Sequence, residues 1–102
     1  ALKKALSHYD RAIRADPRLA EAYANRALVL MRLGRYAEAV RDQERALELI
    51  EGDPVLHVQH AIALVAAGRY RAAAAQIALV RKLGHKPPLG LIKQIRDGIH
   101  SQ

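Results

Sequence analysis

The sequence predicts an all-α protein built from stacked helix pairs, and three observations support this prediction. Residues 33–39 (LGRYAEA) recur in altered form as residues 67–73 (AGRYRAA), so that matched residues lie 34 positions apart. Alanine, the strongest helix former, supplies 20 of the 102 residues. Apolar residues recur at helical spacing in segments that glycine and proline interrupt. A fixed period with matched residue types indicates repeated copies of one supersecondary unit.

Composition sets the broad class of the protein. The 102 residues are enough for one domain, and hydrophobic residues make up 51% of them. The absence of cysteine excludes disulfides and thiolate metal sites. No apolar run reaches the ~18 residues of a spanning helix, which predicts a protein without a membrane span. The lack of cysteine fits a reducing compartment, and the expected location is the cytoplasm. The Ala/Arg-rich, Lys-poor composition is typical of GC-rich genomes and predicts a bacterial source.

Three helices are predicted in the first half of the chain. The first covers residues 1–15 and ends at Asp16-Pro17, because the residue before a proline avoids the helical region. The second covers residues 19–33, and Gly34 supplies the left-handed residue that stops it. The third begins at Tyr36 and runs to about Leu49.

Three further helices are predicted in the second half. Asp53 is a good N-cap and Pro54 suits the first helical position, so a helix is expected over residues 54–67. Another follows over residues 70–83, and a last one over about residues 89–99. The connections are short, which predicts that successive helices are antiparallel neighbours.

These residues make the chain resemble tetratricopeptide repeat proteins, whose motif repeats every ~34 residues. The resemblance rests on small and apolar residues at motif positions in two copies: Tyr23, Ala27, Leu30, Ala39 and Ala46, then Ala61, Leu64, Ala73, Ile77 and Val80. It implies a right-handed superhelical solenoid of antiparallel helix pairs that forms a single domain, 1–102. Its parts would be the second half of a truncated repeat (1–19), two repeats (20–53 and 54–86) and a capping helix (87–102). Arg26 and His60 stand where the family prefers leucine.

The resemblance also implies a function, because in this family the first helix of each repeat lines a concave groove that holds a peptide. We therefore expect a non-catalytic scaffold or adaptor that binds a peptide or a partner helix of another protein. Helix 54–67 is apolar nearly all round, which predicts cover on both sides. The closing helix or a neighbouring chain is an alternative occupant of the groove. The repeat period projects these groove residues: Asn25, Leu28, Met31, Arg32, Val55, Val58, Gln59, Ile62 and Val65.

Some members of the family hold a peptide's C-terminal carboxylate between basic residues and asparagines. Asn25 matches one of those positions, but Val55 and Gln59 stand where the basic residues would be. The sequence therefore argues against a carboxylate clamp.

An alternative function follows from charge, because residues 54–102 carry seven Lys and Arg against one acid, Asp97. Such a basic face could bind a polyanion weakly, either nucleic acid or an anionic surface. No aromatic residue follows Tyr70, so base stacking is absent from this stretch, which argues against nucleic acid as the partner.

Catalytic and metal-binding motifs are missing. The chain has no G-x-S-x-G, no glycine-rich phosphate loop and no threonine, so neither an enzyme nor a cofactor is expected. His57 and His60 are three residues apart and could share a metal, yet no carboxylate lies in their helix, so packing between helices is the preferred interpretation.

The first helix lacks the partner helix of its own repeat. Its apolar residues Leu2, Leu6, Tyr9 and Ile13 would then be uncovered. An uncovered apolar face invites self-association, which we expect through this N-terminal helix.

Overall fold

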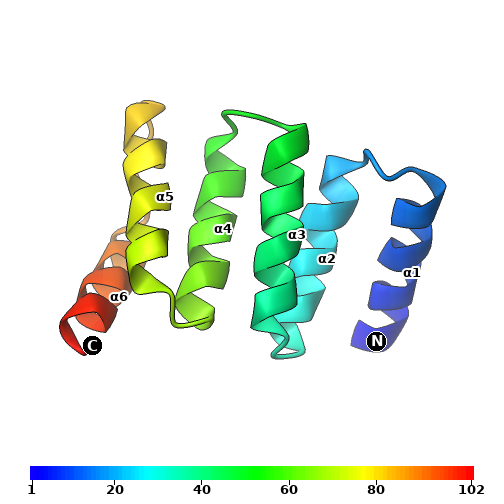
Figure 1. The fold of residues 1–102 in the computed structure, drawn as a ribbon, viewed down its shortest axis with the longest axis horizontal. Helices are drawn as coiled ribbons and strands as arrows, with labels where there is room; N and C mark the ends of the chain where they lie inside the picture. Colours follow the sequence, from blue (N-terminus) through cyan, green and yellow to red (C-terminus); the bar gives the residue numbers. More distant parts are fainter. The chain divides into compact units, whose positions relative to one another are not determined.

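The computed structural model describes all residues, 1–102, as six α-helices and no strands, which confirms the all-α prediction. The chain forms two compact units, Ala1–Glu51 and Gly52–Gln102. Consecutive helices run antiparallel within each unit (Figure 1). The first unit holds α1 (Leu2–Ala15), α2 (Ala20–Arg32) and α3 (Tyr36–Leu49); the second holds α4 (Pro54–Ala66), α5 (Tyr70–Lys82) and α6 (Leu89–His100).

The repeated Gly-Arg dipeptide forms the turn inside each helix pair. Gly34 and Gly68 have positive φ of 76° and 77°, a region that glycine enters without a steric cost. The N–H groups of Gly34 and Arg35 donate to carbonyls of the last turn of α2 at 3.0 and 2.9 Å. Those of Gly68 and Arg69 do the same to α4 at 3.0 and 2.8 Å. Each turn is thus a Schellman cap that satisfies the last carbonyls of one helix before the next begins.

The other predicted helix boundaries also have clear physical causes. Asp16 is extended (φ −144°, ψ 95°), so α1 ends before Pro17. The Tyr23 hydroxyl donates to the Pro17 carbonyl at 3.0 Å and fixes this connection against α2. Asp53 caps α4 by accepting a hydrogen bond from the Val55 N–H at 2.9 Å.

Alanines occupy the places where the helices of a pair cross. Ala27 and Ala39 are fully buried at 0% exposure, and Leu30 completes their cluster. Their equivalents one period later, Ala61 and Ala73, are also 0% exposed. Small side chains allow the two helix axes to approach closely, as the repeat pattern predicts.

The second unit contains one further close approach, at the end of the chain. α6 packs chiefly against α5 and buries Leu91 and Ile95. Gly98 faces the Tyr70 ring so closely that a Cβ at this position would overlap the ring atoms. A glycine at position 98 therefore lets α6 lie against the start of α5 without displacing the Tyr70 ring.

Candidate functional site

The outer face of α4 carries exposed apolar side chains. Val55 is 61% exposed and Ile62 is 44% exposed, although Leu56 and Leu64 on the same helix are buried. Within this chain, α4 is therefore not covered on both sides as expected. α6 packs mainly on α5, which leaves this α4 face open to solvent.

A pocket of about 310 Å³ lies in the second unit beside the first turns of α4. Val55, Val58 and Gln59 line it from α4, and Val80 lines it from α5. The connector to α6 contributes the rest of the wall through His85, Lys86 and Pro88. The Gln59 side-chain oxygen is buried and accepts no hydrogen bond within the chain. The pocket thus has mainly apolar walls, with the buried amide oxygen of Gln59 behind them.

In the first unit, the predicted groove residues lie on α2. Asn25, Leu28 and Arg32 are exposed, and Leu28 keeps 47% of its surface in solvent. Met31 is half-buried because it packs against the cluster of Ala27, Leu30 and Ala39.

The nine predicted groove residues therefore divide between two helices. Four lie on α2, and five lie on α4, where Val65 is half-buried beyond Ile62. Each set follows one helical stripe. That the two stripes act as one groove stays a prediction.

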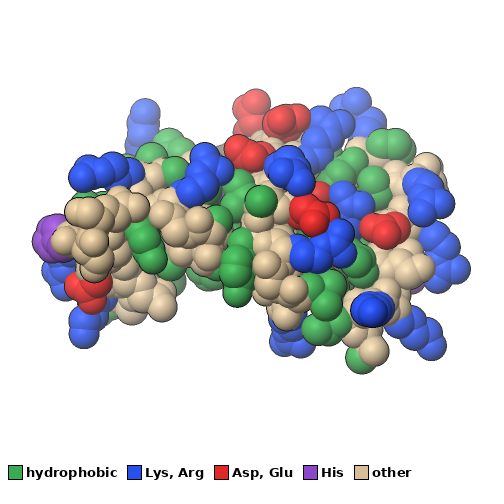
Figure 2. All heavy atoms as spheres, turned by 60° about the horizontal axis from the view of Figure 1, so that its bottom comes forward, with side chains coloured by type: hydrophobic (Ala, Val, Ile, Leu, Met, Phe, Trp, Pro, Cys, Tyr) green, Lys and Arg blue, Asp and Glu red, His purple; other side chains and the backbone are tan.

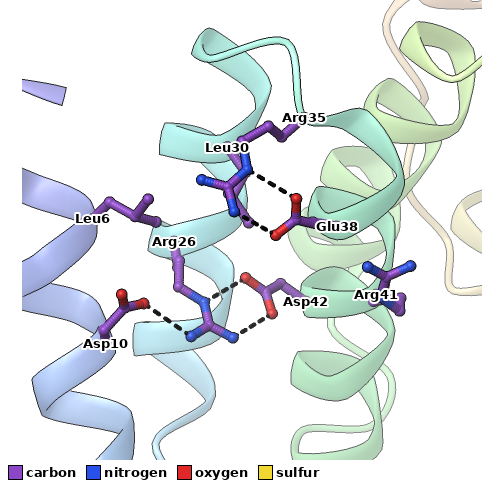
Figure 3. A pocket seen from close by; sticks show the side chains of 8 residues that line it. All are labelled: Leu6, Asp10, Arg26, Leu30, Arg35, Glu38, Arg41 and Asp42. Carbon is purple, nitrogen blue, oxygen red and sulfur yellow. Dashed lines mark hydrogen bonds and ion pairs between the residues drawn. The ribbon is translucent and has the colours of Figure 1, made fainter. Parts of the chain in front are cut away.

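A charged site on the first unit was not predicted from the sequence. Arg26 of α2 bridges the two flanking helices (Figure 3). Its Nε and Nη2 donate to both Asp42 carboxylate oxygens of α3 at 2.7 and 2.8 Å, and its Nη1 donates to Asp10 of α1 at 3.1 Å. The Asp42 side chain is only 8% exposed. The hydrogen bonds that Arg26 donates to Asp42 are the main cause that raises the pKa of the Arg26 guanidinium.

This bridge forms one wall of a polar pocket of about 190 Å³ among α1, α2 and α3. Arg35 donates to both Glu38 carboxylate oxygens at 2.8 and 2.7 Å across its mouth (Figure 3). That ion pair lowers the pKa of Glu38. Arg41 also lines the pocket and is drawn without an ion pair (Figure 3). Two of the three arginines that line the pocket, Arg26 and Arg35, already have a carboxylate partner. We therefore interpret these ion pairs as structural links between the helices.

A signal for this bridge was present in the sequence. Arg26 replaces a leucine of the repeat pattern, and a buried arginine needs acidic partners. Asp42 and Asp10 are the acids on the neighbouring helices that meet that need. The pairing required the helix register, which the repeat period alone does not give.

The two histidines of α4 pack between helices. The His57 Nδ1 lies 2.7 Å from the Gln76 side-chain oxygen of α5, and His60 is buried at 7% exposure. No group of three or more His, Cys, Asp or Glu side chains is arranged to hold a metal ion. None of the six helices combines the length and the hydropathy of a membrane-spanning segment.

Paired antiparallel helices, Schellman turns at a 34-residue period and an exposed apolar helix face define a helical-repeat scaffold. The chain belongs to the tetratricopeptide repeat family. A family model described as "Tetratricopeptide repeat" matches residues 20–53, and one described as "TPR repeat" matches residues 1–34. This family consists of protein-interaction scaffolds and is not a family of catalysts.

Several curated proteins are similar to parts of this chain. The "Protein SGT1 homolog" of Oryza sativa subsp. japonica is 49% identical over 49 residues, which are 48% of this chain and 12% of that protein. The "Hsp70-Hsp90 organizing protein" of Triticum aestivum is 41% identical over 46 residues, 45% of this chain and 8% of that protein. The "E3 ubiquitin-protein ligase TTC3" of Mus musculus is 32% identical over 98 residues, 96% of this chain and 5% of that protein. The chain thus matches only a small part of each relative.

A solved structure has the same fold. The "TPR2B-domain:pHsp70-complex of yeast Sti1" superposes with a TM-score of 0.83 at 21% identity, covering 99% of this chain and 85% of that chain. The match confirms the predicted all-α solenoid. The relatives named here are eukaryotic, so they do not support the predicted bacterial source.

Proposed function

We propose that this chain is a non-catalytic adaptor that binds a peptide or a partner helix of another protein on the exposed faces of α2 and α4. The observation that supports this most strongly is the exposure of Val55 and Ile62 on a helix whose opposite side is buried. An apolar stripe left in solvent is typical of an interaction surface. Burying it against a ligand would stabilise the complex by removing apolar area from water.

The pocket beside Val55 and Val58 is the proposed anchor point. Its volume of about 310 Å³ lies at the lower end of the range for ligand pockets, ~300–1,000 Å³. Apolar side chains of a peptide would occupy it.

The residue types at this pocket favour an internal peptide segment over a chain terminus. Val55 and Gln59 give α4 no cation with which to hold a terminal carboxylate. Lys86 on the connector provides a single charge at the pocket wall, which suits an acidic side chain beside the anchor. The yeast Sti1 domain of the same fold was solved in complex with pHsp70, which supports a protein segment as the ligand class.

The test uses a random peptide display library panned on the intact chain, with selected peptides measured by fluorescence anisotropy. We expect Ile62→Asp to weaken the binding of a selected peptide about fivefold or more, because a carboxylate would replace an apolar contact worth ~1 kcal/mol at the interface. Leu79→Asp on α5 is the matched control, since Leu79 is 40% exposed against 44% for Ile62. Circular dichroism checks that both variants keep their helicity. The proposal would be contradicted if both variants lost affinity equally, or if neither variant lost affinity.

The alternative function, weak polyanion binding by the basic C-terminal half, predicts a different salt response. Contacts to phosphates release counterions and lose affinity steeply as salt rises, roughly tenfold or more between 50 and 200 mM. Binding on α4 through apolar contacts should change less than about twofold over that interval. If the affinity of the selected peptides for the chain falls steeply as salt rises, the electrostatic alternative is favoured.

A further inference from the structure

A second apolar pocket lies on the second unit, between α5 and α6, and shares no residue with the α4 face. Its volume is about 200 Å³. Ile77 of α5 and Ile95 of α6 form its buried floor at 4% and 5% exposure. Ile92 and Ile99 are half-buried and form its walls. The three isoleucines of α6 lie at helical spacing, so the pocket follows the helix as a short groove.

The rim of this pocket is basic. Arg81 from α5 and Arg96 and His100 from α6 line it, and all three are exposed. Neither arginine forms an ion pair or hydrogen bond within the chain, unlike Arg26 and Arg35 in the first unit. Positive charge in this position lacks an internal partner and is available to a ligand.

The wider surface has the same charge. Residues 54–102 carry seven Lys and Arg and one acid, Asp97. Figure 2 shows acidic side chains gathered over the part of the chain before α4 and a single one at the end formed by α6. An occupant with negative charge is therefore favoured, because complementary potentials both attract and orient a partner.

A second copy of this chain would not supply negative charge to this groove through its first helix, α1. The exposed face of α1 carries Lys3, Lys4, Arg11 and Arg14. Stacking α1 of one copy on α6 of another would bring basic groups together, which disfavours this contact.

The volume of the pocket favours a peptide over a small organic ligand as its occupant. A volume of about 200 Å³ is below the ~300–1,000 Å³ of small-molecule sites and suits one or two apolar side chains. A helix that lies in a groove inserts side chains at such positions, with its polar residues beside the rim.

We propose that the groove between α5 and α6 docks an acidic amphipathic helix of another protein, with apolar side chains over the isoleucines and carboxylates against Arg81 and Arg96. This surface is distinct from the α4 face, so both could be occupied at once. The interaction would not depend on the function proposed for α4.

The probe is a fluorescein-labelled helical peptide of about 18 residues with leucines along one face and glutamates beside them. One control peptide has the same composition with the leucines spread around the helix, and a second has lysine in place of glutamate. We expect the acidic amphipathic peptide to bind the intact chain with a Kd on the order of tens of micromolar, and both controls to bind roughly tenfold more weakly.

Variants of the chain locate the site. Arg81→Glu combined with Arg96→Glu should weaken the binding of the acidic peptide about tenfold, because each charge reversal removes an attraction and adds a repulsion. Arg71→Glu is the matched control, since Arg71 is exposed on α5 but does not line the pocket, and it should change the Kd less than about twofold. Amide NMR signals of residues 89–100 should shift on titration, whereas those of residues 55–62 should not.

Three outcomes would overturn the proposal. One is equal weakening by Arg71→Glu and by the double reversal, since that indicates diffuse charge. Another is that the control peptide with dispersed leucines binds as tightly as the amphipathic acidic peptide, since the apolar groove is then not used. The third is the absence of peptide binding while phosphatidylserine vesicles or an oligonucleotide bind and depend on Arg81 and Arg96, since the groove then serves an anionic surface.

Discussion

Replacing Asp42 with asparagine tests the ion-pair bridge of the first unit. The substitution keeps the shape of the side chain but removes its charge and turns one acceptor into an N–H donor that faces the Arg26 donors. Breaking a buried ion pair costs ~3–5 kcal/mol. The Arg26 side chain is 24% exposed and keeps its bond to Asp10, which reduces the expected loss of unfolding free energy to about 2 kcal/mol.

The assay is thermal unfolding followed by circular dichroism, with urea unfolding as a second measurement. A loss of about 2 kcal/mol in a chain of this size corresponds to a fall in Tm of roughly 8–15 °C. Asp10→Asn is the matched control, because it removes a carboxylate from the same guanidinium at a position that is 37% exposed. The control should cost only about 0.5 kcal/mol.

Two results would refute this reasoning. Equal destabilisation by Asp42→Asn and Asp10→Asn would mean that burial of Asp42 does not set the strength of the pair. An additive double mutant of Arg26→Leu and Asp42→Asn would mean that the two residues do not interact, because coupled partners deviate from additivity by ~0.5–3 kcal/mol.

Three further predictions follow from single contacts. Gly98→Ala should destabilise the second unit by about 1–3 kcal/mol because its Cβ overlaps an aromatic ring, whereas Gly90→Ala meets open space and should be neutral or stabilising; equal Tm values for both would contradict the overlap. Asp53→Ala should lower the free energy of unfolding in urea by about 1 kcal/mol through loss of the N-cap, and an unchanged midpoint would exclude a capping role. The pKa of Glu38, measured by carboxyl NMR titration, should rise in Arg35→Met, because the Arg35 hydrogen bond lowers it; the stabilisation is present above the unfolded-state pKa and is lost as pH falls through the lowered folded-state pKa.

Local rules were sufficient to predict the helix boundaries from the sequence. A positive-φ glycine, a residue before proline and an aspartate N-cap each act on their own neighbours, so Gly34, Asp16 and Asp53 mark helix ends without knowledge of the tertiary structure. The 34-residue period then identified which alanines lie at helix crossings.

The candidate sites were less predictable because they depend on where helices lie in space. The period placed Val55 and Ile62 on one stripe, but it could not show that α6 leaves them exposed. The groove of Ile92 and Ile99 required the packing of α6 on α5, which the sequence indicated only as a need for some supporting surface.

Two polar contacts inside the helix pairs use an equivalent position on the second helix of each pair. Positions 42 and 76 are equivalent, 34 residues apart, and each carries a polar side chain on the second helix of its pair. Asp42 accepts a hydrogen bond from Arg26 of α2, and the Gln76 side chain lies within hydrogen-bond distance of His57 of α4. A polar residue inside a helix pair is destabilising unless a partner meets it, and Arg26 and His57 each have a polar partner on the second helix of their pair. Arg26 is therefore not an isolated departure from leucine. It belongs with Asp42, and restoring leucine at position 26 alone would leave a buried carboxylate without its cation.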